Sequence, residues 1–366
     1  MAYNSKNIDW WLLAPILILC LISLITLYSF TIYNQNNFIF FHHQIIWIIS
    51  GFIVLFLVSL IDFRSLASDY QLINIFYGLE ILLLTSTLIF GREIGGNRAW
   101  LNFGSFSIQP VEFAKIILIL FLSRYFADNN LNIRQNKYVL KSFLIVLPFL
   151  LLVGLQRDYG SALLLLGIWF LMLILAGAKI SQILTIILIF LIIFIISWFF
   201  LLDQVHKDRI ISIIFPEIDP YGISYNQSQA LIAISSGGLL GKGFSKSTQA
   251  QLGFLPAAHT DFIFSAIAEE FGFIGVLTII ICFAIIFQRL AQLSLNNNNN
   301  NFVKLFSMGY LIIIFLQVFI NIGMNLAFLP VIGISLPFVS YGGSNLLALF
   351  LGLGIVFNII KNTQNA

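Results

Sequence analysis

Charged residues are scarce in this chain: of its 366 residues only 9% are Asp, Glu, Lys or Arg, whereas 60% are hydrophobic. A soluble domain carries about 25% charged residues. A soluble fold this apolar would expose large hydrophobic patches and aggregate, so the composition predicts an integral membrane protein instead. The formal net charge of +3 is too small to indicate a nucleic-acid partner, and we expect none.

Metal-binding and redox motifs are also missing from the sequence. The two cysteines, Cys20 and Cys282, each lie inside an apolar run, with neither CxxC spacing nor the pattern of a disulfide framework. The four histidines form no ligand set, and no Ser-His-Asp arrangement is legible. We therefore expect no metal site and no cofactor, while a requirement for a divalent cation stays open.

Ten apolar runs approach the length of about 20 residues that a helix needs to cross a membrane. Helices rather than strands follow from the run length, because lipid offers no hydrogen-bond partner to unpaired backbone groups. The runs lie near residues 11–32, 41–61, 71–90, 110–126, 142–156, 160–177, 181–202, 261–287, 302–325 and 343–360. Only the polar segment QRDYG separates the fifth run from the sixth, so nine spans are an alternative.

The predicted fold class is therefore an all-α polytopic membrane protein with about ten transmembrane helices. Residues 1–366 form a single transmembrane domain, with a large outer loop at about 203–260 between the seventh and eighth spans. Lys and Arg are concentrated in the short loops that lie inside if both termini are cytoplasmic, as the positive-inside rule requires. This orientation places nearly all the unusual polar segments at the outer face, where we expect the function to reside.

Two polar features mark the region before and at the start of the fourth span. Glu112 and Lys115 are three residues apart and so share one helix face. A lone charge in lipid is costly, which predicts an ion pair that either fixes helix packing or lines a substrate cavity. Arg98, in the preceding outer loop, is either solvated or held at the headgroup level, where it suits a phosphate ligand. In QRDYG, Asp158 is expected to cap a helix.

The outer segment SSGGLLGKGFSKSTQAQ, residues 235–251, is rich in glycine. It does not match the phosphate-binding loop pattern GxxxxGK[ST], which needs a glycine at Ser236 and a hydroxyl residue at Gly243. Glycines nevertheless free the backbone for anion contacts, and Lys242 and Lys246 supply positive charge. The segment is either a site for a diphosphate headgroup or a flexible solvated loop.

Acidic residues interrupt the apolar segment LGFLPAAHTDFIFSAIAEEFGFIG. Asp261 is expected in the first turn of the eighth span, with His259 or Thr260 as the cap. Asp261 either only favours the helix N-terminus through the dipole or acts as a general base. Desolvation would raise its pKa and the helix dipole would lower it. Glu269 and Glu270 lie about two turns deeper, and at most one of them can share the cavity of Asp261.

Together these motifs resemble the SEDS family (shape, elongation, division and sporulation) over most of the chain. The resemblance is carried by GGNRAWLNFGSFSIQPVEFAK, LLVGLQRDYGSALLLL, SIIFPEIDPYG, AEEFGFIG and NIGMNLAFLPVIGISLPFVSYGGSN. The segment PEIDPYG and the sequence GKGF followed by STQ look more like the RodA branch, which acts in elongation and rod shape, than like the FtsW division branch.

The resemblance implies a ten-span inverting glycosyltransferase that polymerises lipid II, a polyprenyl-diphosphate disaccharide-peptide, at the outer face of the bacterial cytoplasmic membrane. It also implies a class B penicillin-binding protein, a transpeptidase, as partner. The family's essential aspartate matches Asp261, its fourth-span glutamate and lysine match Glu112 and Lys115, and its loop arginine matches Arg98.

On this basis we hypothesise that Asp261 takes the proton from the acceptor sugar hydroxyl. The diphosphate leaving group then needs cationic stabilisation, for which Arg98, Arg209, Lys242 and Lys246 are the candidates. The alternatives are a lipid II flippase or transporter, an FtsW-like division polymerase, and a catalytically idle scaffold. Spans that are nearly uncharged between the outer polar cluster and the cytoplasm favour the enzyme over the transporter.

Overall fold

The structure is a computed structural model that describes residues 9–33, 38–61, 70–94, 96–104, 106–130, 132–200, 204, 207–208, 211, 224–296 and 300–364. Its long helices match the ten predicted apolar runs. They are α1 Trp10–Tyr33, α2 Ile39–Leu60, α4 Tyr70–Phe90, α5 Pro110–Asp128, α6 Asn136–Leu155, α7 Tyr159–Leu175, α8 Ile180–Phe200, α12 Ile263–Asn296, α13 Asn301–Asn325 and α14 Gly343–Gln364. The polytopic helical fold is confirmed, and the nine-span alternative is wrong because α6 and α7 are separate helices.

Within the described residues, seven of these helices are long and apolar enough to cross a membrane, namely all except α5, α7 and α14. Helix α7 and the apolar part of α14, Gly343–Ile359, are shorter. Helix α5 carries Glu112 and Lys115, and it packs against α4, α7, α13 and α14. Its charged residues therefore meet protein rather than lipid, which lowers the cost of placing them at membrane depth.

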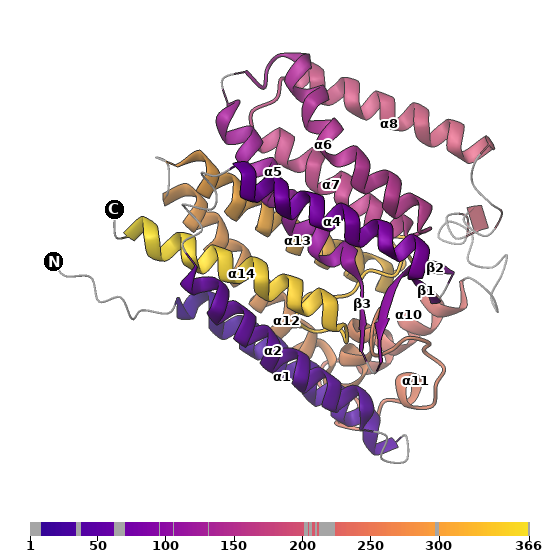
Figure 1. Ribbon diagram of the computed structural model, residues 1–366. Helices are drawn as coiled ribbons and strands as arrows, with labels where there is room; N and C mark the ends of the chain where they lie inside the picture. Colours follow the sequence, from indigo (N-terminus) through magenta and orange to yellow (C-terminus); the bar gives the residue numbers. More distant parts are fainter. Residues whose placement is uncertain are drawn as a thin grey trace.

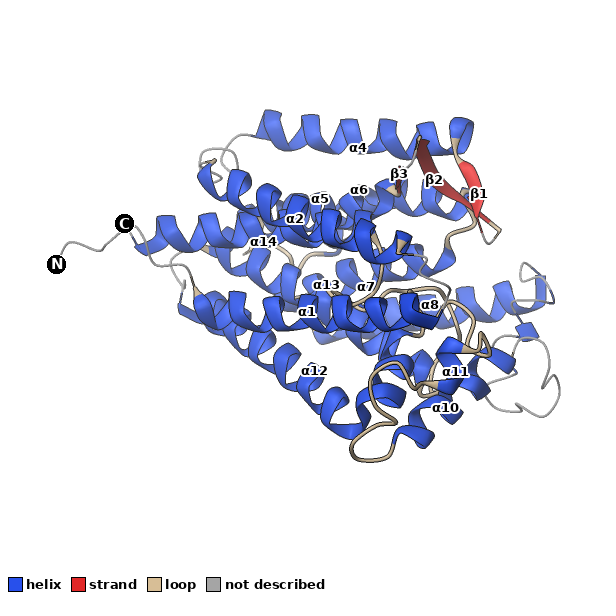
Figure 2. Cartoon of the chain, turned by 90° about the horizontal axis from the view of Figure 1, so that it is seen from below, coloured by secondary structure: helices blue, strands red, loops and turns tan. Residues whose placement is uncertain are grey.

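The helices run side by side, and the start of α1 and the end of α14 lie at the same end of the bundle (Figure 1). The opposite end holds a small antiparallel sheet of β1 Arg92–Ile94, β2 Asn97–Phe103 and β3 Phe106–Ile108, in the order β1-β2-β3. Two further helices, α10 Tyr225–Gly237 and α11 Thr248–Gln251, lie at this end as well (Figure 2). The polar segments of the sequence thus gather at one end.

Helix α12 is not continuous, which corrects the prediction of an unbroken span over 261–287. Gly272 has φ 63° and ψ −157°, a non-helical conformation that divides α12 in two. The break exposes two carbonyls, and those of Glu269 and Glu270 accept hydrogen bonds from the amides of Lys242 and Gly243 at 2.9 and 3.0 Å.

The break also exposes two amides on its other side. Those of Phe273 and Ile274 donate to the carbonyls of Gly238 and Leu239 at 2.9 and 3.3 Å. The segment 238–243 thereby pairs with all four of these backbone groups. Irregular backbone in a membrane span requires this kind of pairing, because lipid provides no partner.

The glycine-rich sequence of this segment follows from its close approach to α12. A Cβ on Gly237 would overlap the carbonyl oxygen of Ala268, and one on Gly241 would overlap that of Glu270. Gly241 also has a positive φ of 79°, which L-residues rarely adopt. The backbone amides of this segment are therefore used to pair with protein carbonyls, and the prediction of an anion-binding backbone is wrong for the amides of Lys242 and Gly243.

Candidate functional site

Asp261 lies in the turn that precedes α12, and not in the first turn of that helix as the sequence predicted. The residue is partly buried, and a Cβ placed on Gly333 would lie 3.8 Å from its Oδ2. Its carboxylate therefore faces the irregular segment between α13 and α14. Burial raises the pKa of Asp261 to about 6, against a hydrogen bond with Thr260 that lowers it. A general base works best with a pKa near the operating pH, so this environment suits the predicted role.

The backbone around Asp261 is held by residues that are distant in sequence. The carbonyl of His259 accepts a hydrogen bond from the amide of Tyr341 at 2.9 Å, and the carbonyl of Thr260 accepts one from Ser340 Oγ at 2.6 Å. The carbonyl of Asp261 itself accepts hydrogen bonds from two side-chain amides of α13. The segment before α14 is thus irregular and largely buried, and it supports the site.

Aromatic rings flank the Asp261 turn on the side of α2. The ring of His259 stacks on Phe40 with centroids 4.4 Å apart, and Tyr341 meets Phe40 edge-on at 5.1 Å. Burial lowers the pKa of His259. These rings form a wall that joins α2 to the segment before α14.

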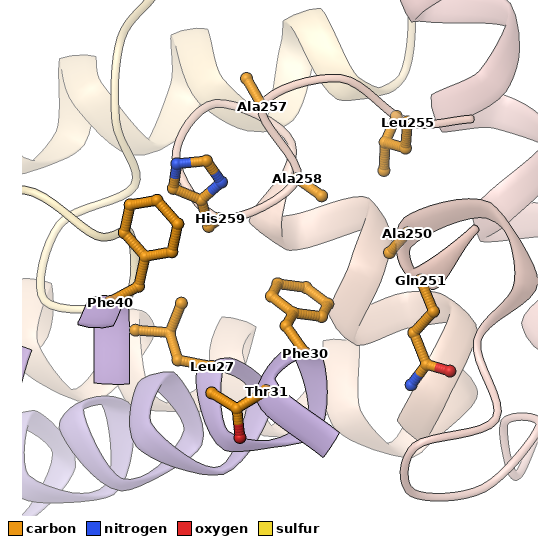
Figure 3. A pocket seen from close by; sticks show the side chains of 10 residues that line it. All are labelled: Leu27, Phe30, Thr31, Phe40, Ala250, Gln251, Leu255, Ala257, Ala258 and His259. Carbon is orange, nitrogen blue, oxygen red and sulfur yellow. The ribbon is translucent and has the colours of Figure 1, made fainter. Parts of the chain in front are cut away.

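A cavity of about 130 Å³ opens beside His259. It lies between the C-terminal end of α1 and the N-terminal end of α2 on one side and residues 250–259 on the other (Figure 3). Phe30 and Phe40 contribute aromatic surface, and Gln251 contributes a polar group. The cavity lining includes His259 but not Asp261, whose carboxylate faces Gly333.

The predicted ion pair in α5 is confirmed. Lys115 Nζ donates to both carboxylate oxygens of Glu112 at 2.8 Å, and Lys115 is 1% exposed. One turn before it, the amide of Gln109 donates to Ser344 Oγ at 2.9 Å, and Gln109 Nε2 donates to Asp158 Oδ2 at 3.0 Å. These bonds join the starts of α5, α7 and α14. The pair therefore stands close to the point where three helices meet.

Asp158 caps α7, as the sequence predicted. Its Oδ1 accepts a hydrogen bond from the amide of Ser161 at 3.1 Å. Just before it, Arg157 has a positive φ of 62°, a conformation that non-glycine residues rarely adopt. Gly160 follows, and a Cβ there would lie 2.5 Å from the carbonyl oxygen of Ile332. Gly333 is next in the chain, so the start of α7 abuts the segment that faces Asp261.

The four candidate cations differ in their surroundings. Arg98 donates from Nε to the carbonyl of Gly91 at 3.0 Å and from Nη2 to that of Ile89 at 3.2 Å, and so stabilises the C-terminal end of α4. Lys242 forms an ion pair with Glu269 at 2.7 Å. Lys246 is exposed. Arg209 lies outside the described residues.

The two glutamates of α12 hold residues of α1 and of the segment 242–251 rather than sharing the surroundings of Asp261. Glu269 is fully buried, and its Oε1 accepts hydrogen bonds from the amide of Thr248 at 2.8 Å and from Lys242 at 2.7 Å. Glu270 accepts hydrogen bonds from Ser29 of α1 and from Gln251. Their roles depend on contacts with α11 and α1. The spacing of residues along α12 does not predict these contacts.

The sequence patterns also did not single out two asparagines of α13, Asn321 and Asn325. Both are fully buried, and both donate to the carbonyl of Asp261 at 3.0 Å. Their spacing of four residues on a predicted span was the one signal available, since it places two polar side chains on the same helix face.

A family model described as "Cell cycle protein", covering FtsW, RodA and SpoVE, matches residues 7–365. The chain is 37% identical over 284 residues to the peptidoglycan glycosyltransferase MrdB of Escherichia coli (strain K12), covering 77% of this chain and 76% of that protein. It is 32% identical over 377 residues to stage V sporulation protein E of Bacillus subtilis (strain 168), covering 100% of each.

Solved structures share the fold. A chain of a peptidoglycan synthase complex, described by its coordination of polymerization and crosslinking, matches with a TM-score of 0.81 and 28% identity, covering 99% of this chain and 100% of that one. The rod shape determining protein RodA of Thermus thermophilus matches with a TM-score of 0.72 and 28% identity, covering 98% and 99%.

Proposed function

Because this chain belongs to the cell cycle protein family of FtsW, RodA and SpoVE, we propose that Asp261 is the general base with which it polymerises lipid II into glycan strands. The chain is a multi-pass membrane protein and a peptidoglycan glycosyltransferase. The observation that carries the role of Asp261 is its place in the turn before α12, partly buried and facing Gly333, with a pKa raised to about 6 by that burial.

In the proposed reaction, Asp261 removes the proton from a hydroxyl of the acceptor sugar. The hydroxyl oxygen attacks the anomeric carbon of the donor, and the bond from that carbon to the diphosphate breaks with inversion. Polyprenyl diphosphate leaves with the bonding electrons, and its negative charge requires nearby cations. The base belongs at the border of water and lipid because both substrates are lipids with sugar headgroups.

The cations proposed for the diphosphate are Arg98, Arg209, Lys242 and Lys246. Lys246 is the exposed lysine of the glycine-rich segment, whereas Lys242 and Arg98 also have protein partners. Glu112 and Lys115 form a buried pair that would shape the cavity wall near the headgroup. The proposed reaction needs no cofactor, and polymerisation with and without EDTA tests a divalent-cation requirement.

We also propose how the protein sits in the bacterial cytoplasmic membrane. Ten spans place both termini on one side, and the charge distribution assigns that side to the cytoplasm. Asp261 and the small sheet then face outward. A class B penicillin-binding protein is the proposed partner, supported by the structural match to a synthase complex that couples polymerization to crosslinking. The matches to MrdB and RodA support a role in elongation.

The test is lipid II polymerisation by the purified protein with its cognate transpeptidase, whose own active site is blocked. Wild type is compared with Asp261→Asn at equal expression and folding. Glycan ladders from wild type alone would support Asp261 as the base. Equal ladders from both would refute it, and no ladder from either, with the partner bound, would favour a flippase or a scaffold.

A further inference from the structure

Three successive backbone carbonyls, those of residues 259–261, each accept a hydrogen bond from a distant part of the chain. The segment before α14 supplies the donors to residues 259 and 260, and α13 supplies those to Asp261. The turn that carries Asp261 is therefore fixed on the side of its backbone. Its carboxylate lies on the side of Gly333.

Asn321 and Asn325 are the residues of α13 that reach this turn. The Nδ2 atom of each donates to the carbonyl of Asp261 at 3.0 Å. Asn321 Nδ2 also donates to the carbonyl of Ile334 at 2.8 Å, and Asn325 Nδ2 donates to the carbonyl of Asn321 at 2.8 Å. One amide thus ties Asp261 to the segment between α13 and α14, and the other ties it to α13 itself.

Asn325 performs a second task at the start of α12. Its Oδ1 accepts hydrogen bonds from the amide of Ser265 at 3.2 Å and from Ser265 Oγ at 2.5 Å. Ser265 is the third residue of α12, whose amide is the one that an N-cap side chain normally satisfies. Asn325 therefore caps α12 from a different helix, in place of the cap that the sequence predicted at His259 or Thr260.

A buried polar residue at membrane depth is costly unless its polar atoms are hydrogen-bonded. Two buried asparagines four residues apart on α13 therefore indicate a specific role. We infer that Asn321 and Asn325 are positioning residues that hold the carboxylate of Asp261 in place for proton transfer. The inference rests on the proposed role of Asp261. A displacement of about 1 Å at a reacting group costs on the order of 100-fold in rate. Loss of either amide frees the turn and lowers the rate of the chemical step.

The experiment measures lipid II polymerisation by the full chain in complex with its transpeptidase, at limiting and at saturating lipid II. The variants are Asn321→Ala, Asn325→Ala and Asn325→Asp. The last keeps the size of the side chain and the acceptor for Ser265, but it loses the amide donor to Asp261. We expect kcat to fall by about 10- to 100-fold in all three, with KM within about twofold of wild type.

A matched control separates positioning from general stability. Tyr310 is also fully buried on α13, about three helical turns from Asn321, and its hydroxyl donates to the carbonyl of Leu349 at 2.7 Å. Tyr310→Phe removes one buried hydrogen bond and should lower the melting temperature while leaving kcat unchanged. If the asparagine variants behave like Tyr310→Phe, the inference is wrong.

One further variant, Ser340→Ala, and a parallel assay of Asp261→Asn keep the outcome decisive. If an alanine variant yields no folded protein, Asn325→Asp and Ser340→Ala carry the test, since Ser340 lies outside the helices and donates to the carbonyl of Thr260. Wild-type kcat in Asn325→Asp overturns the inference. Asp261→Asn is assayed in parallel: if it stays active, the proposed base is wrong, whereas if it is inactive beside fully active asparagine variants, only the positioning role is wrong.

Discussion

The rate of polymerisation should fall as the pH drops through 6, because Asp261 accepts a proton only when it is ionised. Burial raises the pKa of this carboxyl from 3.8 to about 6. With that value, about 90% of Asp261 is ionised at pH 7 and about 10% at pH 5, so the rate falls about tenfold between them. An aspartate with an ordinary pKa would be more than about 90% ionised at both pH values and would show no such fall.

The raised pKa of Asp261 also predicts that its ionised carboxylate lowers the stability of the fold. The pKa of Asp261 is higher in the folded state than in the unfolded chain, so between pH 3.8 and about 6 the folded state binds more protons and loses stability as the pH rises. Above about pH 6 the penalty is complete. Two pKa units correspond to nearly 3 kcal/mol, and partial exposure reduces this to about 1–2 kcal/mol. Asp261→Asn should therefore melt at a higher temperature than wild type at pH 7.

The assay measures initial rates of lipid II consumption at saturating substrate from pH 5 to pH 8, with melting temperature followed at each pH. His259 needs a control because it is a titratable neighbour of Asp261 and burial lowers the pKa of its imidazole. The acidic limb should persist in His259→Gln. A rate that is constant between pH 5 and pH 7 would refute the reasoning, and a limb that disappears in His259→Gln would assign the titration to His259.

Three further predictions concern the supports of the site. Glu112→Gln should destabilise the fold by about 3–5 kcal/mol, because it leaves the ammonium of Lys115 buried without its counter-charge, and thermal unfolding in detergent measures the loss. Gly237→Ala should destabilise by about 1–3 kcal/mol or more, because the new Cβ overlaps the backbone of α12, and the same assay checks it. Glu269→Gln should speed hydrogen exchange of the α11 amides more than about tenfold, because it weakens their buried acceptor.

Each of these predictions has its own control. The double variant Glu112→Gln with Lys115→Met should recover stability, and a double variant less stable than the single one would show that the pair is not the cause. Gly78→Ala, where a Cβ meets nothing within 4 Å, should stabilise α4 by about 1 kcal/mol, so equal losses in both glycine variants would contradict the overlap. Unchanged exchange of α11 in Glu269→Gln would mean that Glu269 does not hold it.

The sequence alone was sufficient for the features that depend on neighbours along one helix. Run length located the ten long helices, seven of which are long and apolar enough to cross a membrane within the described residues, since a bilayer sets the length that such a helix must have. The spacing of Glu112 and Lys115 predicted their ion pair, and the position of Asp158 before an apolar run predicted its cap on α7. These interactions join residues three apart, so helical geometry determines them before any tertiary contact forms.

The small sheet and the break in α12 needed the tertiary structure. The sequence indicated only a loop around Arg98 before the fourth span, because the pairing of its three strands depends on register that no periodicity indicates. The break at Gly272 is stable only because residues 238–243 pair with the backbone that it exposes. The sequence of α12 taken alone favours a continuous helix, because the hydrogen bonds that stabilise the break come from residues 238–243.

For the candidate site too, the sequence predicted some features and only the tertiary structure decided others. The sequence and its family resemblance identified Asp261, but they placed it inside a helix and assigned its cap to a neighbouring residue. The tertiary structure placed Asp261 in a turn, held by Asn321 and Asn325 from 60 and 64 residues further along the chain. How strongly the carboxylate attracts a proton, and hence its pKa, depends on how much water surrounds it. Only the packing of α13 and the segment after it against this turn decided that, because desolvation is a property of the folded surroundings and not of the residue.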